Sequence, residues 1–169
     1  ENRLSKEEGG GCEGCDAGKY SPSGSQCLDC PPGYFCKIKS MSAPTMCGVG
    51  SYSDTRERQS CSPCPAGQFQ NITGAAKCLS CPMGKYLPRS SEGATSNASC
   101  LLCPSGTYGD KEGLEECSIC PAGQVQPAQG QLSCKECTLE GKIKTNNEAR
   151  TACIDNQALL STTLVETMF

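Results

Sequence analysis

The chain has 169 residues, of which 17 are cysteine, and its formal net charge at pH 7 is −3. About one cysteine in ten residues is typical of a disulfide scaffold, and 5% aromatic residues with no tryptophan argue against one large apolar core. Acids and bases are interspersed, which argues against nucleic acid as a partner, and no apolar run is long enough for a transmembrane helix.

These features place the chain in an oxidising compartment. Disulfides persist outside the cell and in the secretory pathway, so we expect an extracellular or cell-surface protein. The sequence opens at Glu1 without Met or an apolar leader, so we interpret it as a mature chain or an excised fragment. The chain has no histidine, the commonest general base, and offers no activated nucleophile, so we expect neither an enzyme nor a cofactor.

The N-terminal segment, residues 1–11, is a polar arm that ends in three glycines. Cys12 follows it and is the odd cysteine of the chain. We expect Cys12 either to close a preceding cysteine-rich repeat or to form a disulfide with a partner chain.

A tandem repeat explains almost every cysteine between residues 12 and 153. Cys-x-x-Cys pairs recur mostly every 17 residues, and the interval of 34 residues between Cys27 and Cys61 hides one more repeat. Its expected start is Pro44, where Pro44-Thr45-Met46-Cys47 has lost the first cysteine. The array therefore contains eight repeats, which start near residues 12, 27, 44, 61, 78, 100, 117 and 134.

Each repeat predicts one short β-hairpin. Glycine stands three residues after the second cysteine, and an aromatic or branched residue follows two residues later, at Tyr20, Phe35, Tyr52, Phe69, Tyr86, Tyr108 and Val125. Proline and glycine favour a turn, residues such as 19–21 and 68–70 an outgoing strand, and the next Cys-x-x-Cys ends the return strand. We expect the ring to fill the gap between repeats rather than to bind a ligand.

The fold class predicted is a small, disulfide-rich, elongated tandem array of about eight short β-hairpin repeats with little or no helix. Each repeat should contact its immediate neighbours in the manner of a one-dimensional stack.

The repeat frame predicts the disulfides, because the second cysteine of one repeat should pair with the first of the next. The expected pairs are Cys15–Cys27, Cys30–Cys36, Cys47–Cys61, Cys64–Cys78, Cys81–Cys100, Cys103–Cys117, Cys120–Cys134 and Cys137–Cys153. Cys36 is an extra cysteine in the repeat whose partner became Pro44. Sequence leaves open a crossed arrangement among Cys30, Cys36, Cys47 and Cys61. A bridge that closes about 15 residues contributes about 3 kcal/mol in the chain-entropy account.

The pattern Cys-x-x-Cys-Pro-x-Gly-x-Tyr/Phe resembles the ephrin-receptor-like cysteine-rich repeat and is similar to the first half of tumour-necrosis-factor-receptor cysteine-rich domains. Residues 64–69 and 103–108 show it best, and the resemblance covers Cys12 to Cys153. It implies rod-like extracellular modules with in-frame disulfides, and it implies no catalytic residue.

Zinc binding is the main alternative, because repeated Cys-x-x-Cys pairs also occur in zinc ribbons. The overlapping chain of similar repeats, and the loss and gain of a cysteine within one repeat, favour disulfides. Thioredoxin-like redox chemistry needs one such pair at the start of a helix, which the polar flanks here do not suggest. The paired carboxylates Glu7-Glu8 and Glu115-Glu116 are interpreted as solvated charge.

Two sequons, Asn71-Ile72-Thr73 and Asn97-Ala98-Ser99, predict N-linked glycans on Asn71 and Asn97. Asn71 should lie at a hairpin tip and Asn97 in the loop of the longest repeat. The run Ser161-Thr162-Thr163 could carry O-linked glycans.

The C-terminal tail, residues 154–169, contains no cysteine and ends in a β-prone stretch with several apolar residues. Such a strand is a candidate for addition to another subunit. Together these features predict an extracellular structural glycoprotein, a self-assembling filament or surface-coat subunit whose partners are head-to-tail copies of itself. The alternative is a ligand-binding, cysteine-rich ectodomain fragment of a cell-surface receptor. Neither hypothesis requires membrane insertion of this segment.

Overall fold

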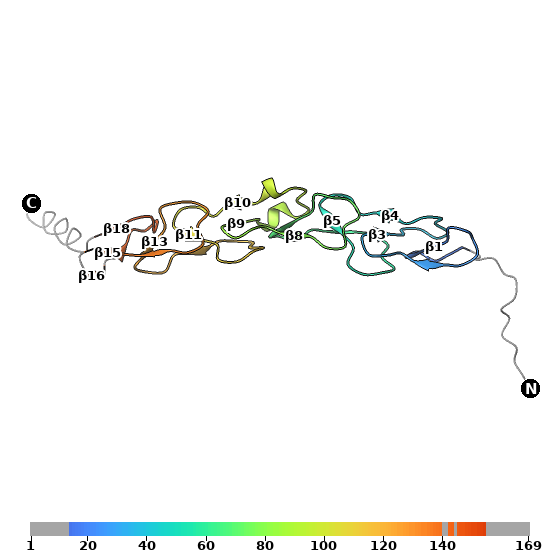
Figure 1. Cartoon of the computed structure of the whole chain (residues 1–169), viewed down its shortest axis with the longest axis horizontal. Coiled ribbons are helices and arrows are strands. Elements are labelled where there is room, and N and C mark those ends of the chain that lie inside the picture. Colours follow the sequence, from blue (N-terminus) through green and yellow to red (C-terminus); the bar gives the residue numbers. More distant parts are fainter. Residues whose placement is uncertain (1–13, 140–141, 144, 155–169) are drawn as a thin grey trace, which may run out of the picture. The chain divides into compact units, whose positions relative to one another are not determined.

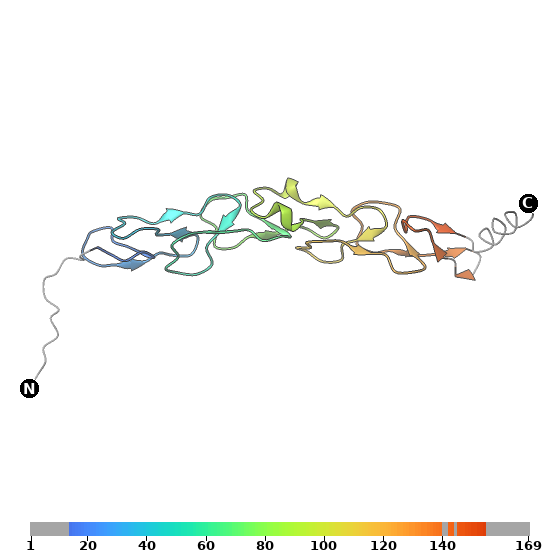
Figure 2. The same cartoon turned by 180° about the vertical axis from the view of Figure 1, so that it is seen from behind.

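The computed structural model describes residues 14–139, 142–143 and 145–154, and the polar arm, Cys12 and tail residues 155–169 lie outside the described residues. The chain forms two compact units. One contains residues up to 65 with 69–79 and 92–96, and the other contains 66–68, 80–91 and the chain from 97 onward. Within each unit, hairpins follow one another in sequence order (Figures 1 and 2).

All strands are two residues long and pair as antiparallel hairpins. The outgoing strands of the first seven hairpins are β1 (Lys19–Tyr20), β3 (Tyr34–Phe35), β5 (Ser51–Tyr52), β7 (Gln68–Phe69), β9 (Lys85–Tyr86), β11 (Thr107–Tyr108) and β13 (Gln124–Val125). Their return strands, in the same order, are β2 (Leu28–Asp29), β4 (Thr45–Met46), β6 (Ser62–Pro63), β8 (Leu79–Ser80), β10 (Leu101–Leu102), β12 (Ser118–Ile119) and β14 (Lys135–Glu136). This arrangement confirms the predicted tandem array of disulfide-rich hairpins.

The last repeat departs from the pattern, because it contains two hairpins instead of one. β15 (Thr138–Leu139) pairs with β16 (Lys142–Ile143), and β17 (Thr145–Asn146) pairs with β18 (Cys153–Ile154). The described residues contain no α-helix. They contain two 3-10 turns, η1 (Arg89–Ser91) and η2 (Asn97–Ser99). No helix among them has the length and apolarity that a membrane crossing requires.

In six of the first seven hairpins the return strand consists of the two residues between the cysteines of a Cys-x-x-Cys, and β4 occupies the same place between Pro44 and Cys47. The outgoing strand starts from a turn whose third residue is a glycine with positive φ, as at Gly50, where φ is 74°. The carbonyl of Gly50 accepts the Cys64 amide at 2.9 Å, and this bond closes the hairpin beside its disulfide. The glycine turn, the hydrogen bonds between the strands and the disulfide therefore all stabilise the same two-residue hairpin, which would be only marginally stable in water on its own.

The interior is built mainly from half-cystines, of which Cys30, Cys36, Cys47, Cys64, Cys81, Cys103 and Cys120 have no exposed surface. The residue at the aromatic position is only partly buried in most repeats. Phe69 is buried, but rings such as Tyr52 and Tyr86 are half-buried, and the residue after the ring lies inside.

Hydrogen bonds explain why that next position is internal. The Gln70 carbonyl accepts the Gly50 amide of the preceding repeat at 2.7 Å, and the Gln70 amide donates to the Ala94 carbonyl of the following repeat at 3.0 Å. Leu87 makes the same two bonds, with Gly67 and Leu114. Because its backbone joins three successive repeats, this residue is enclosed whatever its side chain.

Contacts also reach beyond the immediate neighbours that the sequence predicts. A Cβ built on Gly50 would lie 3.0 Å from the carbonyl carbon of Gly93, two repeats further along, and closer still to its oxygen. Gly67 meets Gly113 in the same way, with 2.6 Å to the carbonyl carbon. The tip of one hairpin therefore packs on the turn glycine of the hairpin two repeats earlier.

Candidate protein-binding groove

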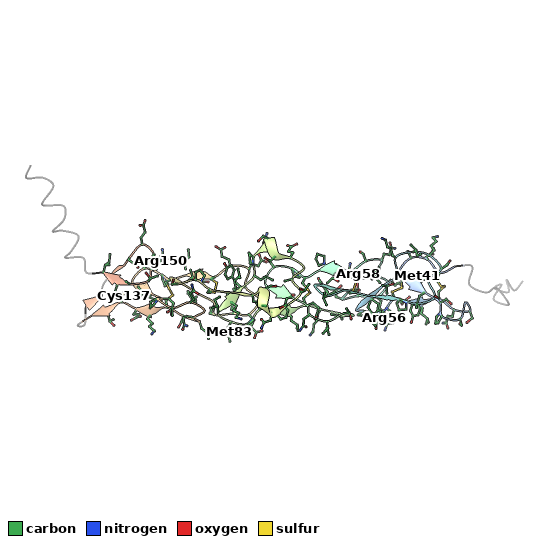
Figure 3. The ribbon with its side chains drawn as sticks, turned by 90° about the horizontal axis from the view of Figure 1, so that it is seen from above. Met41, Arg56, Arg58, Met83, Cys137 and Arg150 are labelled. Carbon is green, nitrogen blue, oxygen red and sulfur yellow. A yellow bond between two sulfur atoms is a disulfide. The ribbon has the colours of Figure 1, made fainter. Side chains whose placement is uncertain are left out.

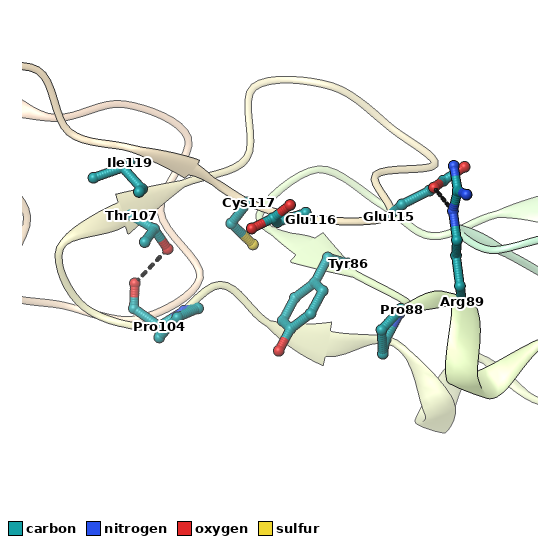
Figure 4. A pocket seen from close by; sticks show the side chains of 9 residues that line it. All are labelled: Tyr86, Pro88, Arg89, Pro104, Thr107, Glu115, Glu116, Cys117 and Ile119. Atoms are coloured by element: carbon teal, nitrogen blue, oxygen red, sulfur yellow. Dashed lines mark hydrogen bonds and ion pairs between the residues drawn. The ribbon is translucent and has the colours of Figure 1, made fainter.

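A groove of about 580 Å³ lies in the second unit, beside the hairpins β9–β10 and β11–β12 (Figure 4). It is lined by Tyr86, Pro88, Arg89, Pro104, Thr107, Glu115, Glu116, Cys117 and Ile119. The lining combines apolar rings and an aliphatic side chain with charged groups, a mixture that suits a protein or peptide ligand.

One face of the hairpin β11–β12 supplies part of the groove. Thr107 and Ile119 are directly opposite each other in the ladder, so their side chains share that face. Thr107 Oγ1 donates to the Pro104 carbonyl at 2.7 Å, which ties the turn to the strand. Ile119 remains 61% exposed, and the Tyr86 ring lies between Pro104 and Pro88 (Figure 4).

Charged side chains form the rim. Arg89 Nε donates to Glu115 Oε2 at 2.8 Å, and Glu116 adds a second carboxylate to the lining (Figure 4). The Arg89 and Glu115 side chains are 81% and 48% exposed, so this ion pair contributes little to stability. Water therefore competes for this ion pair, so its loss on ligand binding would cost little.

The groove depends on the longest repeat of the array. Cys81 and Cys100 are separated by 19 residues, whereas the neighbouring bridges Cys64–Cys78 and Cys103–Cys117 span 14. The longer loop contains η1 and η2, and η1 carries Arg89 to the rim. The spacing of the cysteines was a signal for this feature, which our sequence reasoning did not use.

The disulfides connect the predicted cysteines in the predicted order. The bridges are Cys15–Cys27, Cys30–Cys36, Cys47–Cys61, Cys64–Cys78, Cys81–Cys100, Cys103–Cys117, Cys120–Cys134 and Cys137–Cys153. Cys30 therefore pairs within its own repeat, and the crossed arrangement does not occur. Cys12 lies outside the described residues.

These bridges bear on the zinc alternative. Every cysteine in the described part of the chain is bonded to another cysteine and offers no thiolate to a metal. The same residues contain no cluster of three or more cysteine, aspartate or glutamate side chains that could hold an ion.

The remaining predicted site residues are at the surface. Asn71 is exposed near the tip of the β7–β8 hairpin, and Asn97 is exposed at the start of η2. Glu115 and Glu116 are exposed, as expected for solvated charge, but they also line the groove, which their sequence did not reveal. Lys37, Ile38 and Lys39 are exposed as well, and the sequence analysis did not identify them as candidate site residues.

A charged cluster in the first unit has a structural explanation. Lys19 Nζ lies 2.8 Å from Asp29 and 2.9 Å from Glu57. Asp29 is opposite Lys19 in the β1–β2 hairpin, so the Lys19 ammonium joins this hairpin to Glu57 at the tip of another. The hydrogen bonds to Asp29 and then Glu57 raise the pKa of Lys19, and the bond from Lys19 lowers the pKa of Asp29. In the same unit, Arg58, which is labelled in Figure 3, donates to Asp54 at 3.0 Å. These ion pairs join strands and hairpin tips of the fold, so we regard them as structural.

Comparison with known proteins agrees with the repeat pattern. The family described as "Tyrosine-protein kinase ephrin type A/B receptor-like" matches residues 41–77, 50–100, 67–113 and 106–153. No curated protein matches the chain. The matched segments overlap continuously from residue 41 to residue 153 and coincide with the hairpins and disulfides of the structure, so the chain belongs to the ephrin-receptor-like family of cysteine-rich repeats, which is typical of extracellular domains.

Proposed function

We propose that this protein is an extracellular structural glycoprotein that associates with further copies of itself, as a subunit of a filament or surface coat. The observation that supports this proposal is the exposure of an apolar side chain on five of the first seven return strands, β2, β4, β8, β10 and β12. Leu28, Met46, Leu79, Leu101 and Ile119 are 38%, 54%, 45%, 48% and 61% exposed, respectively.

The exposure follows from the architecture. Each of these return strands runs into a half-cystine with no exposed surface (Cys30, Cys47, Cys81, Cys103 or Cys120), and that half-cystine fills the interior in place of the strand residues before it. An apolar side chain at such a position stays in contact with water unless another molecule covers it, and recurring exposed apolar positions suit a protein contact. Fully burying one aliphatic side chain contributes about 1.5–3 kcal/mol, so several partly covered side chains could hold copies together.

Sedimentation velocity and negative-stain electron microscopy, with protein prepared without reductant, test the proposal. We expect assemblies larger than a monomer, and we expect Leu101→Lys to reduce them. Ser118→Lys is the matched control, because Ser118 occupies the same register position in the next hairpin and is exposed and polar. A wild-type chain that stays monomeric at all concentrations would refute self-association.

The tail and the sequons extend this proposal. Removal of residues 154–169 should abolish polymers if the tail docks on a second copy, and intact polymers would exclude that role. Treatment with peptide N-glycosidase should lower the mass of secreted protein, and Asn71→Gln and Asn97→Gln should each remove one glycan.

The groove favours a second candidate function, a ligand-binding ectodomain of a receptor. A mixed apolar and charged groove suits recognition of a protein ligand. In that case the purified chain should be a monomer on a sizing column and should capture a defined protein partner, which Glu116→Lys should release.

A further inference from the structure

The first unit presents an exposed, basic and apolar segment that we call the basic loop, Lys37-Ile38-Lys39. Ile38 is 64% exposed, the highest value among the large apolar side chains of the described residues. Lys37 and Lys39 are also exposed. The loop leaves directly from Cys36, which is fully buried and bridged to Cys30, so its base is anchored covalently.

The second unit presents the complementary charge. The loop of residues 109–116 contains four carboxylates and one lysine, a net charge of −3, and it ends at the groove with Glu115 and Glu116. The same groove is lined by the Tyr86 ring and by the exposed Ile119 side chain (Figure 4). This surface suits an aliphatic side chain that arrives with a lysine on each side.

We propose that the basic loop of one copy docks in the groove of a second copy. Ile38 would pack on Tyr86 and Ile119, and the flanking lysines would lie beside Glu115 and Glu116. The inference rests on the self-association proposed above and adds one pair of surfaces that would contribute to it. Because the surfaces differ, the contact is head-to-tail and can propagate from copy to copy.

The charges on both surfaces are available at little cost. Lys39 Nζ lies 2.9 Å from Asp16, but their side chains are 76% and 77% exposed, so water competes effectively for that ion pair. The Arg89–Glu115 pair is similarly exposed. Exchange of such pairs for contacts between copies requires no rearrangement of the disulfide-bonded backbone.

Charge also selects this loop over another exposed tip. Ile72 is 61% exposed and stands two residues before a tip residue with positive φ, as Ile38 does. However, Ile72 is flanked by Asn71 and Thr73, which are uncharged and belong to a sequon. The acidic groove therefore favours Ile38 over Ile72, because its carboxylates attract the lysines beside Ile38 and have no opposite charge to attract beside Ile72.

Charge reversal on the full chain tests the docking. Lys37→Glu/Lys39→Glu and Glu115→Lys/Glu116→Lys should each weaken self-association about tenfold or more, because like charges would then meet. An equimolar mixture should recover association, since the reversed loop of one chain matches the reversed groove of the other. Added salt should weaken the wild-type contact.

Matched controls separate this contact from a general effect of charge. Lys77→Glu and Lys135→Glu reverse exposed lysines elsewhere and should leave the association constant unchanged. Ile38→Ser should weaken association without a change in charge. Far-ultraviolet circular dichroism and disulfide mapping would establish that each variant folds.

The outcomes distinguish this inference from the proposed function. If wild-type protein associates and both reversed variants associate equally well, or their mixture fails to recover, then the docking is wrong and self-association stands. If wild-type protein is a monomer at every concentration, then self-association and the docking are both refuted.

Discussion

The turn glycines give the sharpest test of how the repeats interlock. Gly50 and Gly93 face each other across one contact and have nearly equal φ values of 74° and 76°. A Cβ on Gly50 would meet the Gly93 carbonyl and would lie 3.1 Å from Thr95 Cγ2. A Cβ on Gly93 would meet nothing closer than 3.7 Å, which is an ordinary van der Waals contact.

The two alanine substitutions should therefore differ in magnitude. Both place a side chain at positive φ, which costs about 1–2 kcal/mol. Gly50→Ala adds overpacking of about 1–3 kcal/mol, because backbone atoms of Gly93 must move. That movement also strains the bond from the Gly93 amide to the Cys64 carbonyl, now 2.8 Å long. We expect a loss of about 2–5 kcal/mol for Gly50→Ala and about 1–2 kcal/mol for Gly93→Ala.

Urea unfolding with the disulfides intact, followed by circular dichroism, measures both values. Hydrogen exchange of the Gly93 amide provides a local measurement, and exchange should accelerate more in Gly50→Ala. Equal destabilisation by the two substitutions would show that the contact across two repeats does not constrain the fold, and the reasoning above would fail.

Three further predictions concern single residues. Ser40 has φ of 60° at a hairpin tip, a position that Gly74, Gly93, Gly113 and Gly130 occupy in other repeats, so Ser40→Gly should stabilise the protein by about 0.5–1 kcal/mol in the same urea assay, and destabilisation would contradict the explanation. Gln126 is buried, and its Nε2 donates to the Ser133 carbonyl at 2.7 Å, so Gln126→Leu should cost about 1–3 kcal/mol by leaving that carbonyl unpaired, whereas unchanged stability would refute this role. The hydrogen bond from Lys19 lowers the pKa of Asp29, so its stabilising contribution should be present above about pH 4 and be lost as pH falls through the lowered pKa. Carbon-13 titration by NMR should show a lowered Asp29 pKa that returns to normal in Lys19→Met, and an unshifted wild-type pKa would exclude the interaction.

The sequence by itself determined the repeat frame and, outside one region, the expected disulfides. Two cysteines separated by two residues, with glycine three residues later, favour the arrangement in which a bridge closes each short hairpin, whereas Cys30, Cys36, Cys47 and Cys61 had a crossed alternative. The replacement of a cysteine by Pro44 and the gain of Cys36 occur in one repeat, and the structure accordingly contains Cys30–Cys36. This information is local, since each bridge joins residues that are close along the chain.

The tertiary structure decided which side chains face inward and where repeats touch. The sequence suggested the aromatic position as the internal one, but Gln70, Leu87 and Gln126 show that the next residue is enclosed by backbone hydrogen bonds to adjacent repeats. Glutamine and leucine share no property that would mark this position in a sequence. Only the stacking of successive hairpins shows that backbone hydrogen bonds, and not the type of side chain, make this position internal.

The groove and the basic loop also depended on tertiary structure. Glu115 and Glu116 are ordinary charged residues until the fold brings Tyr86 of the preceding hairpin into the same groove as Glu115, Glu116 and Ile119. Lys37 and Lys39 acquire significance because Cys36 is drawn into the interior and Ile38 is left in water. Spacing along the chain determined the covalent scaffold, whereas the surfaces available to a partner arose from the packing of repeats one and two positions apart.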